Sequence, residues 1–281
     1  MKNVFLFLLV FLSFAIQAQE SNQPFHAKVT GSGTPIMLIP GFTVPGDSWD
    51  ETIHELEENY ECHIITLAGF GGKEPIDFPW LPTINEALEN YIEQQQLTNL
   101  TVIGHSLGGT IATWLASREN SSISNIILVD ALPAAGALMI PNFNPDHLAY
   151  DSPYNKQQLA MDEAAFEQMA TGMAQGMSLN PEAQKKIKDW ITLADRKTYV
   201  YGYTDYLKLD LREDLKKISI PVTIIAADKP YGKDMVTQTY QSQYANLSKY
   251  DLIIADNAAH FVMFDQPQWF LAQIRQVLAS K

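Results

Sequence analysis

Short apolar segments alternate with longer amphipathic segments along most of the chain. The apolar segments predict strands, and the continuous run at residues 35–39 is typical of a strand buried on both faces. The predicted strands cover residues 35–39, 62–67, 100–104, 123–129, 222–227 and 250–255. Helices are predicted at residues 47–59, 84–95, 106–118, 211–218, 235–244 and 268–278. Strands and helices that alternate in this way predict βαβ units around a mostly parallel sheet.

Two local signals refine the first third of the chain. Apolar and polar residues alternate over residues 25–30, and the Gly31-Ser32-Gly33 turn after them predicts a hairpin into the next strand. Thr83, followed by Glu86 three residues later, has the pattern of a capping box. It predicts that a helix begins at Ile84.

The alternation of strands and helices stops between residues 132 and 206. This stretch contains no strand-like run and is rich in Met, Ala and Gln, which predicts helices. We therefore expect an α/β fold whose mostly parallel central sheet is flanked by helices. Its core would comprise residues 19–131 and 207–281, and residues 132–206 would form a helical lid over one edge of the sheet.

Methionines recur at helical spacing within the predicted lid. Met169, Met173 and Met177 are four residues apart and would share one helix face. Flexible thioether side chains suit an adaptable apolar pocket, although the same stripe could pack the lid onto the body. Gly172 and Gly176 beside them indicate a close approach or a mobile segment.

The first 18 residues have the layout of a secretory signal peptide. Lys2 provides a positive start, residues 4–16 are almost wholly apolar, and Ala18 is a small residue suited to cleavage. The apolar run is too short to cross a bilayer comfortably. We expect a secreted or periplasmic protein with no stable membrane insertion after the signal has been cleaved.

Composition narrows the classes of partner. The chain has 281 residues and carries a net charge of −13, which disfavours binding to nucleic-acid phosphates. Cys62 is the single cysteine and falls in a predicted buried strand, so it is expected to be a structural thiol. Cys and His residues at metal-ligand spacing are absent from the sequence, and we expect neither a metal site nor a cofactor.

The segment from Gly104 to Gly109 carries the strongest chemical signal. A β-branched strand leads into it and an apolar helix leaves it, which is the context of a nucleophile elbow around Ser106. The small flanking residues give the strained turn room to push the serine hydroxyl outward. The Leu107 amide then lies at a helix N-terminus, where it could stabilise an oxyanion.

A serine hydroxyl needs a base, and His260 is the best candidate. It follows the last predicted strand by a short loop, and its late position suits the chain order nucleophile, acid, histidine. Two aspartates end strands at the sheet edge where ligands bind in such folds. Asp228 is the preferred acid, and Asp130 is the alternative. Gly41 allows an unusual turn after the strand at 35–39, so the Phe42 amide is the expected second oxyanion donor.

These features together resemble the α/β-hydrolase fold superfamily, specifically its lidded serine esterases. The resemblance covers about residues 25–278 and rests on Leu38-Ile39-Pro40-Gly41-Phe42, Leu67-Ala68-Gly69-Phe70-Gly71-Gly72, the elbow, the segment from Asp210 to Val222, and His260-Phe261 to Pro267. In the family the stretch from Leu67 to Gly72 usually begins with Asp-x-Pro-Gly, so Ala68 is a departure. The family's acid commonly falls two residues beyond Asp228, where this chain has Pro230. That departure leaves the identity of the acid open.

The resulting hypothesis is hydrolysis of small or medium apolar carboxylic esters through an acyl-enzyme on Ser106. Lactonase, amidase or aminopeptidase, acyltransferase and C–C hydrolase activities use the same elbow and stay open, as does a non-catalytic ligand-binding role. An aminopeptidase would need acidic lid residues to meet a substrate amine, and Asp162, Glu163 and Glu167 are available.

Overall fold

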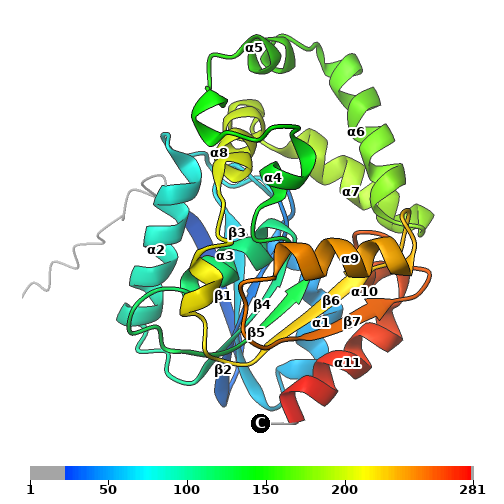
Figure 1. The fold of residues 1–281 in the computed structure, drawn as a ribbon. Helices are drawn as coiled ribbons and strands as arrows, with labels where there is room; N and C mark the ends of the chain where they lie inside the picture. Colours follow the sequence, from blue (N-terminus) through cyan, green and yellow to red (C-terminus); the bar gives the residue numbers. More distant parts are fainter. Residues whose placement is uncertain (1–22, 280–281) are drawn as a thin grey trace, which may run out of the picture.

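Within residues 23–279, which the computed structural model describes, seven strands form one sheet in the order β1-β3-β2-β4-β5-β6-β7 (Figure 1). The strands are β1 (Phe25–Gly31), β2 (Thr34–Ile39), β3 (Tyr60–Leu67), β4 (Leu100–His105), β5 (Ile123–Val129), β6 (Val222–Ala227) and β7 (Asp251–Ala255). All neighbouring pairs are parallel except β1 with β3. The mostly parallel sheet predicted from the apolar runs is confirmed.

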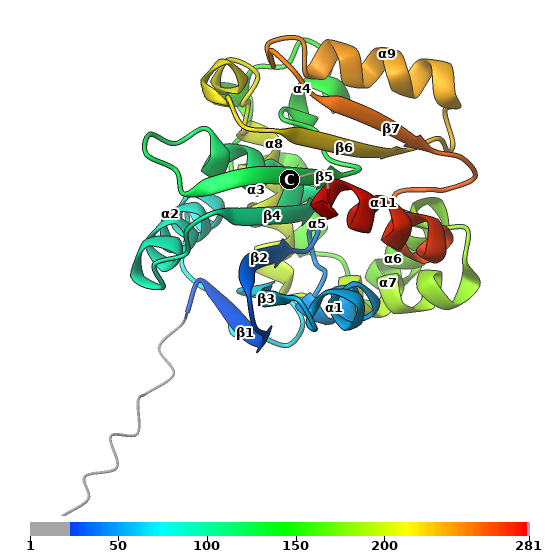
Figure 2. The ribbon, with the colours of Figure 1, turned by 90° about the horizontal axis from the view of Figure 1, so that it is seen from below.

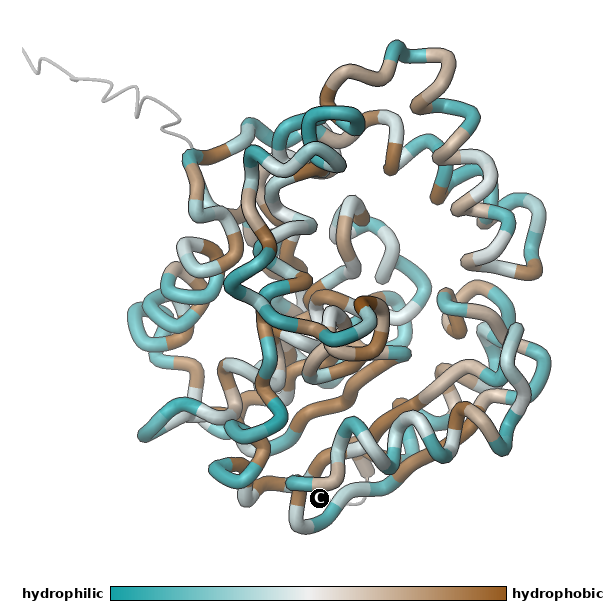
Figure 3. The backbone as a smooth tube through the Cα atoms, turned by 45° about the horizontal axis from the view of Figure 1, so that its top comes forward, coloured by the Kyte–Doolittle hydropathy of each residue, from teal (hydrophilic) through white to brown (hydrophobic). Residues whose placement is uncertain are grey.

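Helices cover both faces of the sheet (Figure 2). One face packs against α2 (Trp80–Gln94), α3 (Leu107–Ala116) and α9 (Lys233–Gln243), and the other packs against α1 (Asp50–Leu56), α10 (Val262–Asp265) and α11 (Pro267–Ala279). Successive residues of β2 point to opposite faces: Met37 and Ile39 join the first core, and Ile36 and Leu38 join the second. Hydrophobic colouring accordingly follows the strands and alternates with polar colouring along the outer helices (Figure 3).

A helical insertion connects β5 to β6. It contains α4 (Ala135–Met139), the 3-10 turn η2 (Pro145–His147), α5 (Pro153–Leu159), α6 (Glu163–Met177), α7 (Pro181–Leu193), the π-helical turn η3 (Thr198–Gly202) and α8 (Tyr203–Lys208). The helices stand together at one end of the sheet (Figure 1). Residues 132–206 are thus helical as predicted, but the boundary expected at residue 206 falls inside α8.

The chain enters the sheet differently from the sequence prediction. Instead of forming a hairpin with β2, β1 pairs antiparallel with β3 over its whole length. The turn at Gly31 and Gly33 crosses close to the start of β3, where a Cβ on Gly31 would lie 2.3 Å from the Tyr60 carbonyl oxygen. The helix predicted at residues 47–59 is also shorter and begins as the 3-10 turn η1 (Gly46–Trp49) before α1.

The start of α2 corrects the capping-box prediction. The helix begins at Trp80, and Thr83 lies inside its first turn with its hydroxyl donating to the Pro79 carbonyl. The cap comes from the insertion: Asp205 of α8 accepts hydrogen bonds through Oδ2 from the amides of Trp80 (2.7 Å) and Leu81 (3.1 Å). A carboxylate suits this position because the free N–H groups and the helix dipole both favour negative charge. The same contact fastens α8 to the body.

Candidate active site

Ser106 occupies a strained turn between β4 and α3. Its backbone has φ 51° and ψ −120°, a conformation that residues with a side chain rarely adopt. The turn needs glycine on both sides. A Cβ on Gly104 would lie 2.3 Å from the Gly108 carbonyl oxygen, and one on Gly108 would lie 2.1 Å from the Ile39 carbonyl oxygen. These contacts are the steric requirement inferred from the Gly104–Gly109 motif.

His260 pairs with Asp130. The distance from His260 Nδ1 to Asp130 Oδ2 is 2.7 Å, so the ring N–H donates to the carboxylate. The other carboxylate oxygen, Oδ1, accepts from the Ala227 amide at 3.0 Å and the Tyr240 hydroxyl at 2.9 Å. Burial alone would raise the pKa of Asp130, but these hydrogen bonds and the charge of His260 outweigh it and hold the pKa below its ordinary value. Asp130 is therefore ionised at neutral pH.

Asp228, the aspartate preferred from the sequence, does not meet His260. Its Oδ2 accepts from Lys229 Nζ at 2.8 Å, and its Oδ1 accepts from the Ala258 amide at 3.2 Å. Asp228 thus binds the backbone of the loop that carries His260, two residues before the imidazole. The preference is corrected in favour of Asp130, because the ring nitrogen faces the end of β5 and not the end of β6.

The loop after β2 lies directly against the elbow. A Cβ on Gly41 would be 3.3 Å from the Ser106 Cβ, which brings the next amide, that of Phe42, close to the serine. The Phe42 ring packs edge-on against Phe70 and Trp80 and fixes the loop. Leu107 is the first residue of α3, where helix N–H groups have no intrahelical partner. Both amides predicted as oxyanion donors therefore border the serine.

His105 comes directly before the nucleophile in the elbow and has a close relation to the site. It lines the same cavity as Ser106. Its Nε2 donates to the His260 carbonyl oxygen at 3.0 Å, and the two rings lie 4.6 Å apart. Burial, and then the charge of His260, lower the pKa of His105 to about 3, so it remains neutral and braces the backbone of His260.

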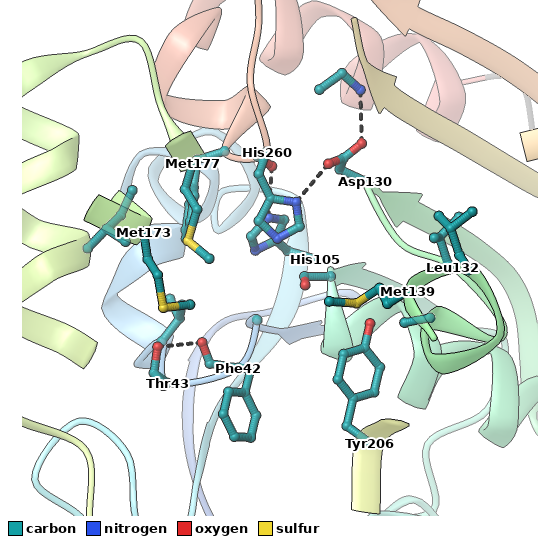
Figure 4. Close-up of a pocket in the computed structure, with 18 of the residues that line it drawn as sticks. Phe42, Thr43, His105, Asp130, Leu132, Met139, Met173, Met177, Tyr206 and His260 are labelled. Atoms are coloured by element: carbon teal, nitrogen blue, oxygen red, sulfur yellow. Dashed lines mark hydrogen bonds and ion pairs between the residues drawn. The ribbon is translucent and has the colours of Figure 1, made fainter. Parts of the chain in front are cut away.

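Ser106, Asp130 and His260 all line one cavity of about 690 Å³. Figure 4 shows Asp130 and His260 in this cavity. Five strand-end loops form its floor and the helical insertion forms its roof. Most of its lining is apolar or aromatic, including Phe42, Leu132, Met139, Met173, Met177, Ile187, Ile191, Tyr199, Tyr203 and Tyr206. Such a space suits an uncharged, largely apolar molecule.

Comparison with known proteins assigns the chain to a family. A model described as the alpha/beta hydrolase family matches residues 36–273, a range that holds most of β2, all of β3 to β7, the insertion and the residues of the site. The chain belongs to the α/β-hydrolase family. The fold expected from the sequence resemblance is therefore confirmed.

Curated relatives of this α/β-hydrolase include esterases and a lipase. The pimeloyl-[acyl-carrier protein] methyl ester esterase of Vibrio cholerae is 23% identical over 254 residues, which cover 88% of this chain and 95% of the relative. The corresponding protein of Shewanella oneidensis is 27% identical over 260 residues, covering 90% and 94%. The (lyso)-N-acylphosphatidylethanolamine lipase of Homo sapiens is 23% identical over 281 residues, covering 88% and 80%.

Solved structures show the same α/β-hydrolase fold. An esterase from Exiguobacterium antarcticum superposes with a TM-score of 0.74 at 19% identity, covering 91% of this chain and 95% of that one. The enol-lactonase from Burkholderia xenovorans gives 0.73 at 14% identity, covering 91% and 96%. Identities this low establish the shared fold, and the chemistry must be argued from the site itself.

The insertion of this α/β-hydrolase combines both roles considered for its methionines. Met173 and Met177 line the cavity, and together with Met169 they also pack against the core beside α6 and α7. Of the two alternatives for Gly172 and Gly176, the close approach is wrong, because a Cβ at either position would meet nothing within 4 Å. The mobile segment stays a prediction.

The acidic residues of the insertion that could have met a substrate amine make structural contacts instead. Asp162 caps α6 by accepting from the Ala165 amide, and Glu167 pairs with Lys188. Neither these two residues nor Glu163 is among those that line the cavity. These three carboxylates therefore do not form the amine-binding group that an aminopeptidase needs.

Three residues that make contacts at the site were not identified from the sequence. Tyr240 of α9 bonds Asp130, and Tyr206 of α8 approaches Ser106. Asp265 accepts from the Ala259 amide, next to His260, and from the Leu179 amide of the insertion. Tyr206 had a readable signal, because Tyr199, Tyr203 and Tyr206 recur at helical spacing.

Within residues 23–279, no group of three or more His, Cys, Asp and Glu side chains is arranged to hold a metal ion. None of the helices in that range is long and apolar enough to cross a membrane. The signal peptide predicted at residues 1–18 lies outside the described residues.

Proposed function

We propose that this α/β-hydrolase is a serine esterase that cleaves carboxylic esters through an acyl-enzyme. The observation that carries the proposal is the ionised Asp130–His260 pair, which opens into the same apolar cavity as Ser106 on its strained turn. Strain at this position makes sense where a hydroxyl must be presented to a substrate. The activities of two relatives, a methyl ester esterase and a lipase, support the same reaction class.

In the proposed mechanism Ser106 Oγ attacks the ester carbonyl while His260 Nε2 takes its proton. His260 then gives that proton to the leaving alcohol, and the acyl group stays on Ser106. A water molecule repeats the sequence and releases the acid. Asp130 holds the Nδ1–H tautomer and stabilises the imidazolium that forms. The Phe42 and Leu107 amides hold the tetrahedral oxyanion, and loss of one such donor typically costs about 10²–10³ in turnover.

The substrate proposed for this site is a small or medium, uncharged and largely apolar ester. The ionised carboxylate in the lining, Asp130, is committed to His260, and the Lys229 ammonium is paired with Asp228. Neither charge is free to bind a charged substrate group. The methionine and tyrosine side chains contributed by the insertion surround an acyl chain more readily than a sugar or nucleotide. We propose that the insertion acts as a lid.

A fluorophosphonate probe tests the nucleophile, and p-nitrophenyl esters of two to eight acyl carbons test the reaction. We expect the probe to label the wild-type protein and not Ser106→Ala. Hydrolysis should favour short and medium chains and fall at least about 10³-fold in Ser106→Ala and His260→Ala. Equal labelling of the wild type and Ser106→Ala would refute the assignment of Ser106. Export into the periplasm or medium is a separate proposal, tested by fractionating cells that express the full chain.

A further inference from the structure

Tyr206 reaches the nucleophile from the insertion. It lies in α8, its side chain is only 7% exposed, and it lines the cavity that holds Ser106. Figure 4 shows its ring extending from α8 with the hydroxyl pointing into the cavity. The hydroxyl lies close enough to the side chains of Ser106 and Thr110 to interact with both. A helix of the insertion therefore contributes a polar group at the reacting serine.

The residue before Tyr206, Asp205, holds α8 and therefore the phenol in position. Asp205 binds the amides of Trp80 and Leu81 at the N-terminus of α2, and its other oxygen accepts from the Tyr150 hydroxyl. A buried carboxylate with three donors does not shift easily. The end of α8 that carries Tyr206 is thus anchored to the body of the protein.

Other tyrosines of the same helical segment make different contacts. The Tyr199 hydroxyl lies 3.4 Å from Met173 Sδ, and the Tyr203 hydroxyl lies 3.6 Å from Met139 Sδ. Thioether sulfur is a weak acceptor. Tyr206, in contrast, is placed against two hydroxyl groups, one of which belongs to the nucleophile.

The hydrogen-bond directions around Tyr206 are constrained. Thr110 Oγ1 donates to the Leu132 carbonyl at 2.9 Å, so towards the phenol it acts as an acceptor. Burial raises the pKa of Tyr206, and its interactions with Thr110 and Ser106 only partly oppose that rise. The phenol therefore keeps its single proton throughout the working pH range. Thr110 Oγ1 and Ser106 Oγ are both acceptors for this proton, and it turns to Ser106 Oγ when that oxygen carries the greater negative charge.

We propose that Tyr206 is a catalytic residue whose hydroxyl donates a hydrogen bond to Ser106 Oγ whenever that oxygen carries developing negative charge. The inference rests on the proposed function of Ser106. During acylation, the Ser106 proton moves to His260, the Oγ–carbon bond forms, and the alcohol leaves with the proton from His260. During deacylation, water gives a proton to His260, its oxygen bonds to the acyl carbon, and Ser106 Oγ leaves and regains a proton from His260. The phenol proton stays on Tyr206 in both halves.

Tyr206→Phe tests this role because it removes the hydroxyl and keeps the ring. We expect kcat/KM for p-nitrophenyl butyrate to fall about 10–100-fold, the usual effect of losing a hydrogen bond to a charged atom. KM should change little, because the lost interaction strengthens only as charge develops. Pre-steady-state release of p-nitrophenol should show that acylation and deacylation are both slower. Labelling of Ser106 by a fluorophosphonate should slow by a similar factor.

Tyr244→Phe is the matched control. Tyr244 is also a buried phenol. Its hydroxyl donates to the Ala131 carbonyl at 2.9 Å, but it does not line the cavity. Both variants should lose similar thermal stability, whereas only Tyr206→Phe should lose the chemical rate. Equal rates for wild type and Tyr206→Phe, or equal losses in the two variants, would overturn the inference. A wild-type protein that the probe does not label would overturn the proposed function itself.

Discussion

Replacing Asp130 by asparagine keeps the shape of the side chain and removes its charge. The two carboxylate oxygens have different partners: Oδ1 accepts from the Ala227 amide and the Tyr240 hydroxyl, and Oδ2 accepts from His260 Nδ1. An asparagine NH2 group at the Oδ1 position would face two donors. The amide oxygen is therefore expected to take that position, which leaves the NH2 group facing His260.

This orientation forces the imidazole into the wrong tautomer. His260 Nδ1 would have to accept from the new NH2 group, and the ring proton would move to Nε2. A protonated Nε2 cannot take the proton of Ser106, and the imidazolium of the transition state would no longer face a carboxylate. Asparagine in the same place of a serine–histidine–aspartate triad lowers turnover about 10⁴-fold. We expect kcat to fall about 10³–10⁴-fold in Asp130→Asn.

The assay is steady-state hydrolysis of p-nitrophenyl butyrate at neutral pH, with Asp228→Asn as the control. An asparagine at 228 can still accept from the Ala258 amide, so we expect its kcat to stay within about threefold of wild type. Circular dichroism melts establish that both variants are folded. The reasoning is refuted if Asp130→Asn keeps more than about a tenth of the activity, or if Asp228→Asn is the variant that loses it.

Three further predictions concern stability and reactivity. Asp205→Ala removes the cap of α2 and should lower the free energy of unfolding by about 1–3 kcal/mol in urea titrations; an unchanged midpoint would contradict the capping role. Gly172→Ala and Gly176→Ala should each raise it by about 0.5–1 kcal/mol, because both sites are helical and open; a lower melting temperature would show that glycine is needed there. Burial raises the pKa of Cys62 to about 11, so at pH 8 this protonated, inaccessible thiol should react with Ellman's reagent only on unfolding, and rapid reaction of the native protein would contradict its burial.

The sheet was predictable wherever apolar residues form continuous runs. The strand at residues 123–129 was predicted with the bounds it has, since a strand buried on both faces leaves little freedom in composition. Two failures have a common cause in long-range contacts. Strand β1 pairs with β3 and not with its sequence neighbour, and the helix expected to begin at Ile84 begins at Trp80, where a carboxylate 125 residues away caps it. Local patterns contain no information about such partners.

The candidate site likewise contains residues that local sequence predicts and residues that depend on long-range contacts. Ser106 was found from a local motif and His260 from chain order, and the structure brings both to one cavity. The acid was misassigned because both aspartates end strands, and the direction of the imidazole decides between them. Asp130 stands at φ 44°, a turn that sequence does not reveal, and its second support, Tyr240, comes from a helix 110 residues away.

Because Asp130 lies at the end of β5, the loop after β6 does not supply the carboxylate that binds His260, and its cavity-lining side chains can vary. Lys229, Tyr231 and Met235 line the cavity from that loop and the start of α9, and Tyr231 is 70% exposed. None of these side chains bonds the histidine or its carboxylate partner. A combinatorial library at these three positions would therefore vary which esters enter the cavity while leaving the proton-transfer apparatus intact. If the proposed function holds, substrate selectivity and chemistry should therefore be separable by mutation.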